Sequence, residues 1–301
     1  MKTCTAPAEC EDSGVGSNLP RRLWILASVA GLLLRAQDTE FVCPMDRDVR
    51  SPLPGTCPRC GMKLVAGLPM PVEYPMDFRA HPPSLPAGRP VTLEFRILDP
   101  KTSRPITRFE IIHEKLFHLF VVSQDLEYFS HEHPALGSDG WFRLKTRLPK
   151  PGVYRLLADF DPSGGTPQLA ARTFSTAGWY APLTGSIAHP PQDLATQRGA
   201  NLSVSLTLDP EIPVAGKKTM LFFQVAPADG LEQFIGAWAH LLAVSNDLID
   251  TIHSHPFLAD GGPQMQFNLF FPRAAPYRIW LQLQRNGVVN TVSFTLHAKS
   301  L

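Results

Sequence analysis

The sequence predicts an all-β protein in which two tandem immunoglobulin-like sandwiches follow a small cysteine module. Three observations predict this architecture. The 301 residues include 30 prolines, which interrupt the chain too often for long helices and suit short strands joined by turns. Short apolar runs are separated by Gly, Pro, Asn and Asp, as strands are separated by hairpin turns. The second half of the chain repeats the pattern of the first, and each copy has about 100 residues, the size of one sandwich.

The composition is that of a folded protein with no bias toward nucleic acid. Hydrophobic residues make up 44% of the chain and charged residues 18%, so most of the chain should fold around a core. Lys and Arg total 28 against 27 for Asp and Glu, whereas binding to a phosphate backbone demands a basic excess. We therefore expect no nucleic-acid partner.

Residues 1–39 predict a leader for export. An uncharged apolar run of 12 residues, 23–34, follows Arg21 and Arg22, as the apolar region of a secretory signal follows its basic region. The run is short for a bilayer span, and Ala36 offers a weak cleavage site. We expect a periplasmic protein, or one that an uncleaved leader anchors to the membrane facing outside the cytoplasm. A buried core helix and an upstream error in the start site are the alternatives.

Behind the leader, the sequence divides into a cysteine module at 40–66, a first sandwich at 72–178 and a second sandwich at 200–298. A linker rich in Pro, Gly and Thr separates the two sandwiches. Apolar runs predict strands at 91–98, 116–123, 141–148 and 153–160 in the first, and at 202–208, 220–225, 239–245, 265–271 and 277–283 in the second. Residues 118–134 match 240–256 at an offset of 122, and 148–155 match 271–278 at an offset of 123, so the domain is duplicated.

Three cysteines, Cys43, Cys57 and Cys60, follow the leader, whereas Cys4 and Cys10 precede the apolar run. An odd number of cysteines leaves one thiol unpaired in an exported chain, which favours a metal or redox role. The spacing C-x13-C-x2-C forms a knuckle of soft thiolates, which select Zn²⁺, Cu(I) and similar cations. A segment of about 25 residues is too small to fold on a core of its own and needs such a staple.

The segment 41–65 resembles the small heavy-metal-binding domain of bacterial copper and cobalt-zinc-cadmium export components. That domain reads Cys-Pro-Met-His and then Pro-Gly-x-Cys-Pro-x-Cys-Gly-Met-x-Leu. The resemblance implies Cys43, Cys57 and Cys60 as ligands of a heavy-metal ion, with Asp46 where the family has His. The fourth ligand is then Asp46, water or another residue, and an oxygen ligand weakens the preference for Cu(I). A disulfide between Cys57 and Cys60, or a redox pair, is the alternative, although a redox module needs a βαβ context.

Each sandwich also carries a histidine hairpin. With turns centred near residues 125–126 and 247–248, the register sets His118 opposite His133 and diagonal to His131, and it sets His240 opposite His255 beside His253. Histidines two residues apart on a strand share one face, so three imidazoles converge in each copy and can form half of a Zn²⁺ or Cu(II) site. A structural role is the alternative, with the His-x-His-Pro end of the strand capping backbone groups. His81, His113, His189 and His297 have no such partners and stay unassigned.

The first copy resembles exported bacterial proteins, often of unknown function, that couple such histidine-bearing β domains to heavy-metal-binding domains. The resemblance is carried by the strings at 113–123 and 128–134, and it implies export and metal association. The chain shows no Ser-His-Asp order, phosphate loop or His-Glu-x-x-His pattern. We therefore expect no enzyme.

The expected function is to bind copper, zinc or a related heavy-metal ion outside the cytoplasm, for sequestration, delivery or resistance, with a metal-export or envelope protein as partner. Two alternatives stay open. The chain is an envelope interaction module stapled by a zinc knuckle, or a metal-dependent enzyme with Asp125, Glu132 or Asp139 as a general base.

Overall fold

The computed structural model describes residues 40–46, 49–67, 72–180 and 187–301, and every regular element within these ranges is a strand. The predicted leader, with its apolar run and its two cysteines, lies outside the described residues. Among the residues described, no helix has the length and apolarity needed to cross a membrane.

The cysteine module is a three-stranded antiparallel sheet in the order β2-β1-β3, formed by β1 (Glu40–Val42), β2 (Arg50–Ser51) and β3 (Val65–Gly67). Its buried centre consists of three cysteines and Leu64, with a few partly buried apolar side chains packed around them. Sulfur atoms therefore make up much of the interior of this module, so whatever the thiols bind also contributes to its folding.

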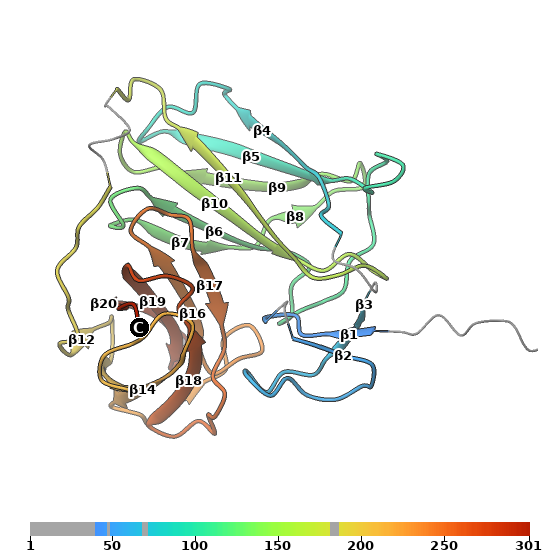
Figure 1. Cartoon of the computed structure of the whole chain (residues 1–301). Coiled ribbons are helices and arrows are strands. Elements are labelled where there is room, and N and C mark those ends of the chain that lie inside the picture. Colours follow the sequence, from blue (N-terminus) through green and yellow to red (C-terminus); the bar gives the residue numbers. More distant parts are fainter. Residues whose placement is uncertain (1–39, 47–48, 68–71, 181–186) are drawn as a thin grey trace, which may run out of the picture. The chain divides into compact units, whose positions relative to one another are not determined.

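The first repeat has two four-stranded antiparallel sheets (Figure 1). One sheet has the order β4-β5-β9-β8, with β4 (Met76–His81), β5 (Pro90–Ile97), β8 (Ala135–Leu136) and β9 (Phe142–Arg147). The other has the order β11-β10-β6-β7, with β6 (His118–Ser123), β7 (Phe129–Glu132), β10 (Val153–Phe160) and β11 (Gln168–Ser175). This division of strands is that of an immunoglobulin-like sandwich, as predicted.

The second repeat has the same plan. One sheet has the order β12-β13-β14-β18, with β12 (Gln197–Arg198), β13 (Ser203–Asp209), β14 (Lys218–Ala226) and β18 (Gln264–Phe270). The other contains β15 (Leu231–Glu232), β16 (His240–Ser245), β17 (Thr251–Ser254), β19 (Pro276–Arg285) and β20 (Val288–His297), with β19 paired to both β16 and β20.

The strands predicted from apolar runs are all present, with ends that differ by a few residues, whereas the longer strands β4, β11 and β20 and several strands of two or three residues were not predicted. The omission of β20 is instructive because its hairpin turn is Asn286-Gly287, in which both residues have positive φ, 50° and 73°. That pair is a strong hairpin signal.

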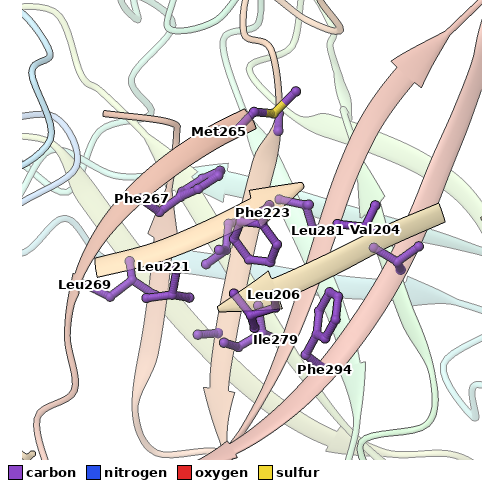
Figure 2. Close-up of a cluster of buried hydrophobic side chains, with 14 of the residues drawn as sticks. Val204, Leu206, Leu221, Phe223, Met265, Phe267, Leu269, Ile279, Leu281 and Phe294 are labelled. Carbon is purple, nitrogen blue, oxygen red and sulfur yellow. The ribbon is translucent and has the colours of Figure 1, made fainter. Parts of the chain in front are cut away.

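Each repeat has its own hydrophobic core between its two sheets. Figure 2 shows the core of the second repeat, where Phe223 of β14, Phe267 of β18 and Phe294 of β20 meet with neighbouring aliphatic side chains. Strand β5 alternates between buried and less buried positions, as a strand with one covered face does. All six residues of β6 and all six of β16 are buried, so these two strands are covered on both faces.

A tyrosine corner recurs in both repeats. The hydroxyl of Tyr154 donates to the carbonyl oxygen of Lys150 at 2.7 Å, and that of Tyr277 donates to the carbonyl oxygen of Arg273 at 3.1 Å. A tyrosine near the start of the strand that bonds back to the preceding corner is a hallmark of the immunoglobulin-like sandwich. The tyrosine corner therefore explains why residues 148–155 are repeated at 271–278 in the sequence.

The second buried face of β6 and of β16 belongs to a third apolar cluster, which contains side chains of both repeats. Leu119 and Val121 of β6 lie in the core of the first repeat, whereas Phe120 and Val122 lie in the shared cluster. The shared cluster consists of Phe120, Val122, Leu126 and Leu157 of the first repeat and Leu242, Val244, Leu248 and Trp280 of the second. The same faces of β6 and β16 carry His118 and His240, because side chains two apart on a strand share a face.

Candidate metal centres

The cysteine site brings three thiols and one carboxylate together. Sγ of Cys43 lies 3.4 Å from Sγ of Cys60, and Oδ2 of Asp46 lies 3.3 Å from Sγ of Cys57. One ligand atom from each of the four residues lies within 4.8 Å of the others. All three cysteines are free and buried. The backbone N–H of Gly61 donates to the carbonyl oxygen of Cys57 at 2.9 Å, which closes the knuckle.

Hydrogen bonds and burial set the proton affinities of these thiols. The hydrogen bond with Cys60 lowers the pKa of Cys43 to about 7. Burial raises the pKa of Cys57 to about 11, and the bond to Cys43 raises the pKa of Cys60. A soft cation that binds here thus meets one ready thiolate and displaces protons from the other two thiols.

Asp46 takes the place that the family pattern gives to histidine, and the structure aims it at the thiols. Its Oδ1 pairs with the guanidinium of Arg59 at 3.2 Å, and its other oxygen faces Cys57. The guanidinium of Arg59 also lies over the ring of Phe270, 4.4 Å from its centroid. The carboxylate is therefore held with one oxygen toward the three sulfur atoms.

The hairpin of the first repeat has the predicted register. Phe120 of β6 pairs with His131 of β7, and Leu119 pairs with Glu132. One step further along, this register sets His118 opposite His133. In the second repeat Leu242 pairs with His253 in the same way.

Turn chemistry explains why both hairpins adopt this register. Leu126 and Leu248 have the same positive φ of 61°, at equivalent points of the two turns. The carboxylate of Asp125 accepts a hydrogen bond from the backbone N–H two residues further on, and Asp247 does the same. Both are Asx turns, which fix the turn and with it the pairing of the strands.

The histidines of the first repeat converge as predicted. Nδ1 of His118 lies 3.1 Å from Nε2 of His131 and 3.2 Å from Nε2 of His133. These nitrogens all lie within 4.8 Å of one another. The ring of Phe120 stacks on His131 with centroids 4.3 Å apart, which fixes the plane of that imidazole.

The second repeat forms the same triad from His240, His253 and His255. Nε2 of His255 lies 2.8 Å from Nδ1 of His240, and one ring nitrogen of each residue lies within 4.8 Å of the others. All three side chains are buried, whereas in the first triad only His118 is fully buried. We call the two sets the first triad and the second triad.

A backbone carbonyl fixes the tautomer of one histidine in each triad. Nε2 of His118 donates to the carbonyl oxygen of Ile112 at 2.9 Å, and Nε2 of His240 donates to that of Phe234 at 2.7 Å. A carbonyl oxygen accepts and does not donate, so the proton of each neutral ring is on Nε2. Nδ1 of each ring therefore faces the centre of its triad with a lone pair.

Side chains of the opposite repeat fix a second histidine in each triad. Nδ1 of His131 lies 2.9 Å from Oε1 of Gln282, whose amide nitrogen donates to Thr291 at 3.0 Å, so the amide oxygen faces the ring. Nδ1 of His253 lies 2.9 Å from Oδ2 of Asp159. His131 therefore carries its proton on Nδ1 with Nε2 facing the first triad, and His253 donates from Nδ1 to Asp159, which leaves its Nε2 for the second triad.

Two unprotonated nitrogens thus face each other in the first triad. Nδ1 of His118 and Nε2 of His131 are 3.1 Å apart, and both rings donate their single proton elsewhere. In the second triad, the buried Nε2 of His253 has no hydrogen-bond partner. Buried nitrogens are costly unless paired, so a cation fits this arrangement of donors.

Burial disfavours a proton on five of the six triad histidines. Burial, followed by the charge of neighbouring imidazoles, lowers the pKa of His118 to about 4 and that of His133 to about 3. Burial likewise lowers the pKa values of His131, His240 and His255 well below the ordinary range. At neutral pH these rings are neutral, which is the form that binds metal.

The sequence analysis left His113 unassigned, and the structure places it inside the cluster. Its ring lies against His255 with centroids 3.7 Å apart, and 5.8 Å from the ring of His240. Its Nε2 is buried without a hydrogen-bond partner. The second repeat has Ile235 at the equivalent position, so the search for repeated histidines missed it. His113 directly follows Ile112, whose carbonyl oxygen fixes His118, and this proximity to His118 is the signal that could have identified it.

The other histidines lie apart from the triads. The exposed His81 pairs with Glu94 at 3.3 Å, and Nε2 of His297 donates to the carbonyl oxygen of Pro190 at 3.0 Å. His189 is exposed in the segment between the repeats.

The three carboxylates considered as a general base have other surroundings. Asp125 bonds with Ser123 in the hairpin turn, and Asp139 forms an exposed ion pair with Arg143 at 2.6 Å. Glu132 is the last residue of β7 and directly follows His131, so it projects to the opposite face of the strand.

Three cavities among the described residues are lined by both the cysteine module and the histidine triads, and the smallest is bordered by Met45, His118 and His253. Another, of about 240 Å³, is bordered by Cys60 and Met62 on one side and by His113 and His255 on the other. The third, of about 340 Å³, is bordered by Met45, Asp46, Asp159 and His253, among others. The cysteine module therefore lines the same cavities as the histidine triads.

Together, the fold and the sites define a metal-binding protein with a sulfur site and two β-sandwich repeats that carry histidines. The chain belongs to the family described as Domain of unknown function (DUF8832), whose model matches residues 74–178 and 197–300. Residues 41–66 match the model of the Heavy metal binding domain, as the resemblance of the cysteine motif implied. No curated protein matches the chain.

Solved structures resemble the chain over most of its length at low identity. The adhesin FdeC of Escherichia coli is 15% identical, over 80% of this chain and 68% of that one, with a TM-score of 0.26. A segment of two fibronectin type III domains from chicken tenascin is 11% identical, over 75% of this chain and 100% of that one, with a TM-score of 0.23. Similarity at this level concerns the fold alone.

Proposed function

We propose that this chain is an exported, non-catalytic protein that binds copper, zinc or a related heavy-metal ion for sequestration, delivery or resistance. Thiolates suit Zn²⁺ and Cu(I), and neutral imidazoles suit Zn²⁺ and Cu(II). The basic and apolar order of residues 21–34 supports export. A metal-export or envelope protein is the partner that would receive the ion.

One observation carries the proposal for the histidines. Nδ1 of His118 and Nε2 of His131 face each other at 3.1 Å, while Ile112 and Gln282 accept the protons of the two rings. His133 can donate one proton to Nδ1 of His118 from 3.2 Å, but Nε2 of His131 then still faces that nitrogen without a proton of its own. A metal ion about 2.0 Å from each nitrogen uses both lone pairs instead.

The test is a titration of the purified chain with Zn²⁺ in competition with a chromophoric chelator. The wild-type chain should bind ions at the cysteine site and at both triads, each more tightly than about 1 mM. His133→Ala should abolish one of these sites and leave the cysteine site intact. The matched control is His81→Ala, which removes an exposed imidazole outside the triads and should bind as the wild type does.

The opposite result would reject metal binding by the triads. If the triads bind neither Zn²⁺ nor Cu(II) more tightly than about 1 mM, the histidines are structural. The repeats then belong to an interaction module stapled by the cysteine site. Hydrolysis or redox turnover by the metal-loaded protein would instead support the alternative that the chain is a metal-dependent enzyme.

A further inference from the structure

The two triads are in contact with each other across the boundary between the repeats. The ring of His131 in the first triad lies 5.3 Å from that of His240 in the second, and the ring of His118 lies 5.9 Å from that of His253. Within the second triad, His240 and His253 are 6.2 Å apart. The other pairs within a triad are 4.6 to 5.4 Å apart, so rings of different repeats are about as close as the most widely spaced pair of one triad.

One histidine of each triad is hydrogen-bonded by a side chain of the other repeat. Asp159 pairs with His118 across β10 and β6, and Gln282 pairs with His240 across β19 and β16, so these two residues hold equivalent positions. Asp159 of the first repeat binds His253 of the second triad, whereas Gln282 of the second repeat binds His131 of the first triad. Each triad therefore needs the other repeat to orient its ligands.

The two side chains that bind the triads differ in charge, because Asp159 has a carboxylate and Gln282 has a neutral amide. A carboxylate behind a metal-bound histidine increases the basicity of the ligand, and outer partners of this kind change metal affinity by about 10 to 100-fold. The amide of Gln282 orients its histidine without supplying a negative charge. The second triad also has three buried histidines, against one in the first.

We propose that the two triads form one binuclear centre, in which the second triad, supported by Asp159, fills first and the first triad binds a second ion more weakly. This inference rests on the proposed function, because it assumes that the triads bind metal. The first ion adds positive charge beside the empty triad, and repulsion between two nearby cations opposes the second. Two ions bonded at about 2.0 Å to these nitrogens lie within about 10 Å of each other, which is close enough for magnetic coupling.

The test uses the full chain with Cys43, Cys57 and Cys60 changed to Ser, so that added Cu(II) goes to the histidines. Electron paramagnetic resonance should show an isolated Cu(II) spectrum at one equivalent. At two equivalents, the spectrum should broaden and show a half-field transition. Two equivalents with twice the isolated spectrum would overturn the binuclear centre while leaving metal binding intact.

Two substitutions test the order of filling. Asp159→Asn keeps a hydrogen-bond acceptor and removes the charge, so it should lower the affinity for the first ion by about 10 to 100-fold. Gln282→Glu adds a carboxylate behind His131 and should raise the affinity for the second ion by about 10-fold. Far-ultraviolet circular dichroism confirms that each variant is folded, and Gln282→Glu tests the idea even if Asp159→Asn fails to fold.

Unchanged affinities in both variants would overturn the inequivalence of the two triads. Failure of the wild-type triads to bind any Cu(II) or Zn²⁺ would overturn the metal role of the histidines, and the binuclear centre with it. These two results differ, because in the first case the protein still binds two ions.

Discussion

The rings of Phe129 and Trp280 stack face to face across the two repeats, with centroids 5.1 Å apart and planes inclined by 11°. Trp280 is 4% exposed and lies in the apolar cluster that both repeats share. His118 and His240 lie on β6 and β16, which contribute Phe120 and Leu242 to this cluster, so apolar packing between the repeats holds the two triads together.

Trp280→Ala should therefore lower the free energy of unfolding by about 3 kcal/mol, because truncating a buried aromatic ring loses its burial and leaves a cavity. Urea denaturation followed by circular dichroism measures the change. Ile249→Ala is the control, since Ile249 is 62% exposed and its truncation should change stability by no more than about 0.5 kcal/mol. Equal stability of the two variants would show that the repeats do not depend on this packing.

Changing Cys57 and Cys60 together to Ser should remove one bound thiophilic ion. The sandwiches should stay folded, because their cores contain no residue of the cysteine module. Elemental analysis of protein from metal-supplemented cells measures the ion, and circular dichroism measures the fold. The control replaces Cys4 and Cys10, which lie outside the cysteine motif. If the double variant keeps its full metal content, the cysteine site is wrong.

The stability of the metal-free protein should fall as the pH decreases from about 6.5 to about 4. The pKa of His118 is lowered to about 4 from the ordinary 6.5, and that of His133 to about 3. Below pH 6.5 the unfolded chain therefore binds protons that the folded chain does not, and the folded state loses stability. Denaturation of EDTA-treated protein at several pH values measures this effect. Replacing His118 and His133 with Gln should flatten the profile, and a wild-type profile that is already flat would contradict the burial of neutral imidazoles.

A fusion of residues 1–39 to a reporter that is active only outside the cytoplasm should give signal. The order of basic and apolar residues is what the export machinery reads. A matched fusion in which Arg21 and Arg22 are both changed to Glu should give less signal. A wild-type fusion that stays inactive would place the protein in the cytoplasm.

Local sequence determined much of the fold and of each separate triad. Asp125 and Asp247 fix two equivalent turns, and a fixed turn sets which residues face each other across a hairpin. The convergence of three imidazoles follows from that register and from the alternation of side chains along a strand. Both steps depend on residues that are close in the sequence, which is why they could be predicted.

The relation between the two triads depends on contacts between distant parts of the chain, and the sequence analysis missed it. Asp159 and Gln282 act on the opposite repeat, at separations of 94 and 151 residues from the histidines that they bind. One signal was available. The runs at 118–123 and 240–245 are apolar without the alternation of a strand that has one exposed face. Such a run indicates a strand covered on both sides, and therefore a contact between the repeats.

The equivalent positions of Asp159 and Gln282 show what a tandem chain gains over a dimer. Two separate copies of one repeat, related by a two-fold axis, would carry the same side chain at both positions. Covalent fusion removes that constraint, since each position has its own codon. In the proposed binuclear centre, the charge behind one ion would then change by mutation while the charge behind the other stays as it is. Evolution could adapt one half of such a chain to retain its ion and the other half to release it.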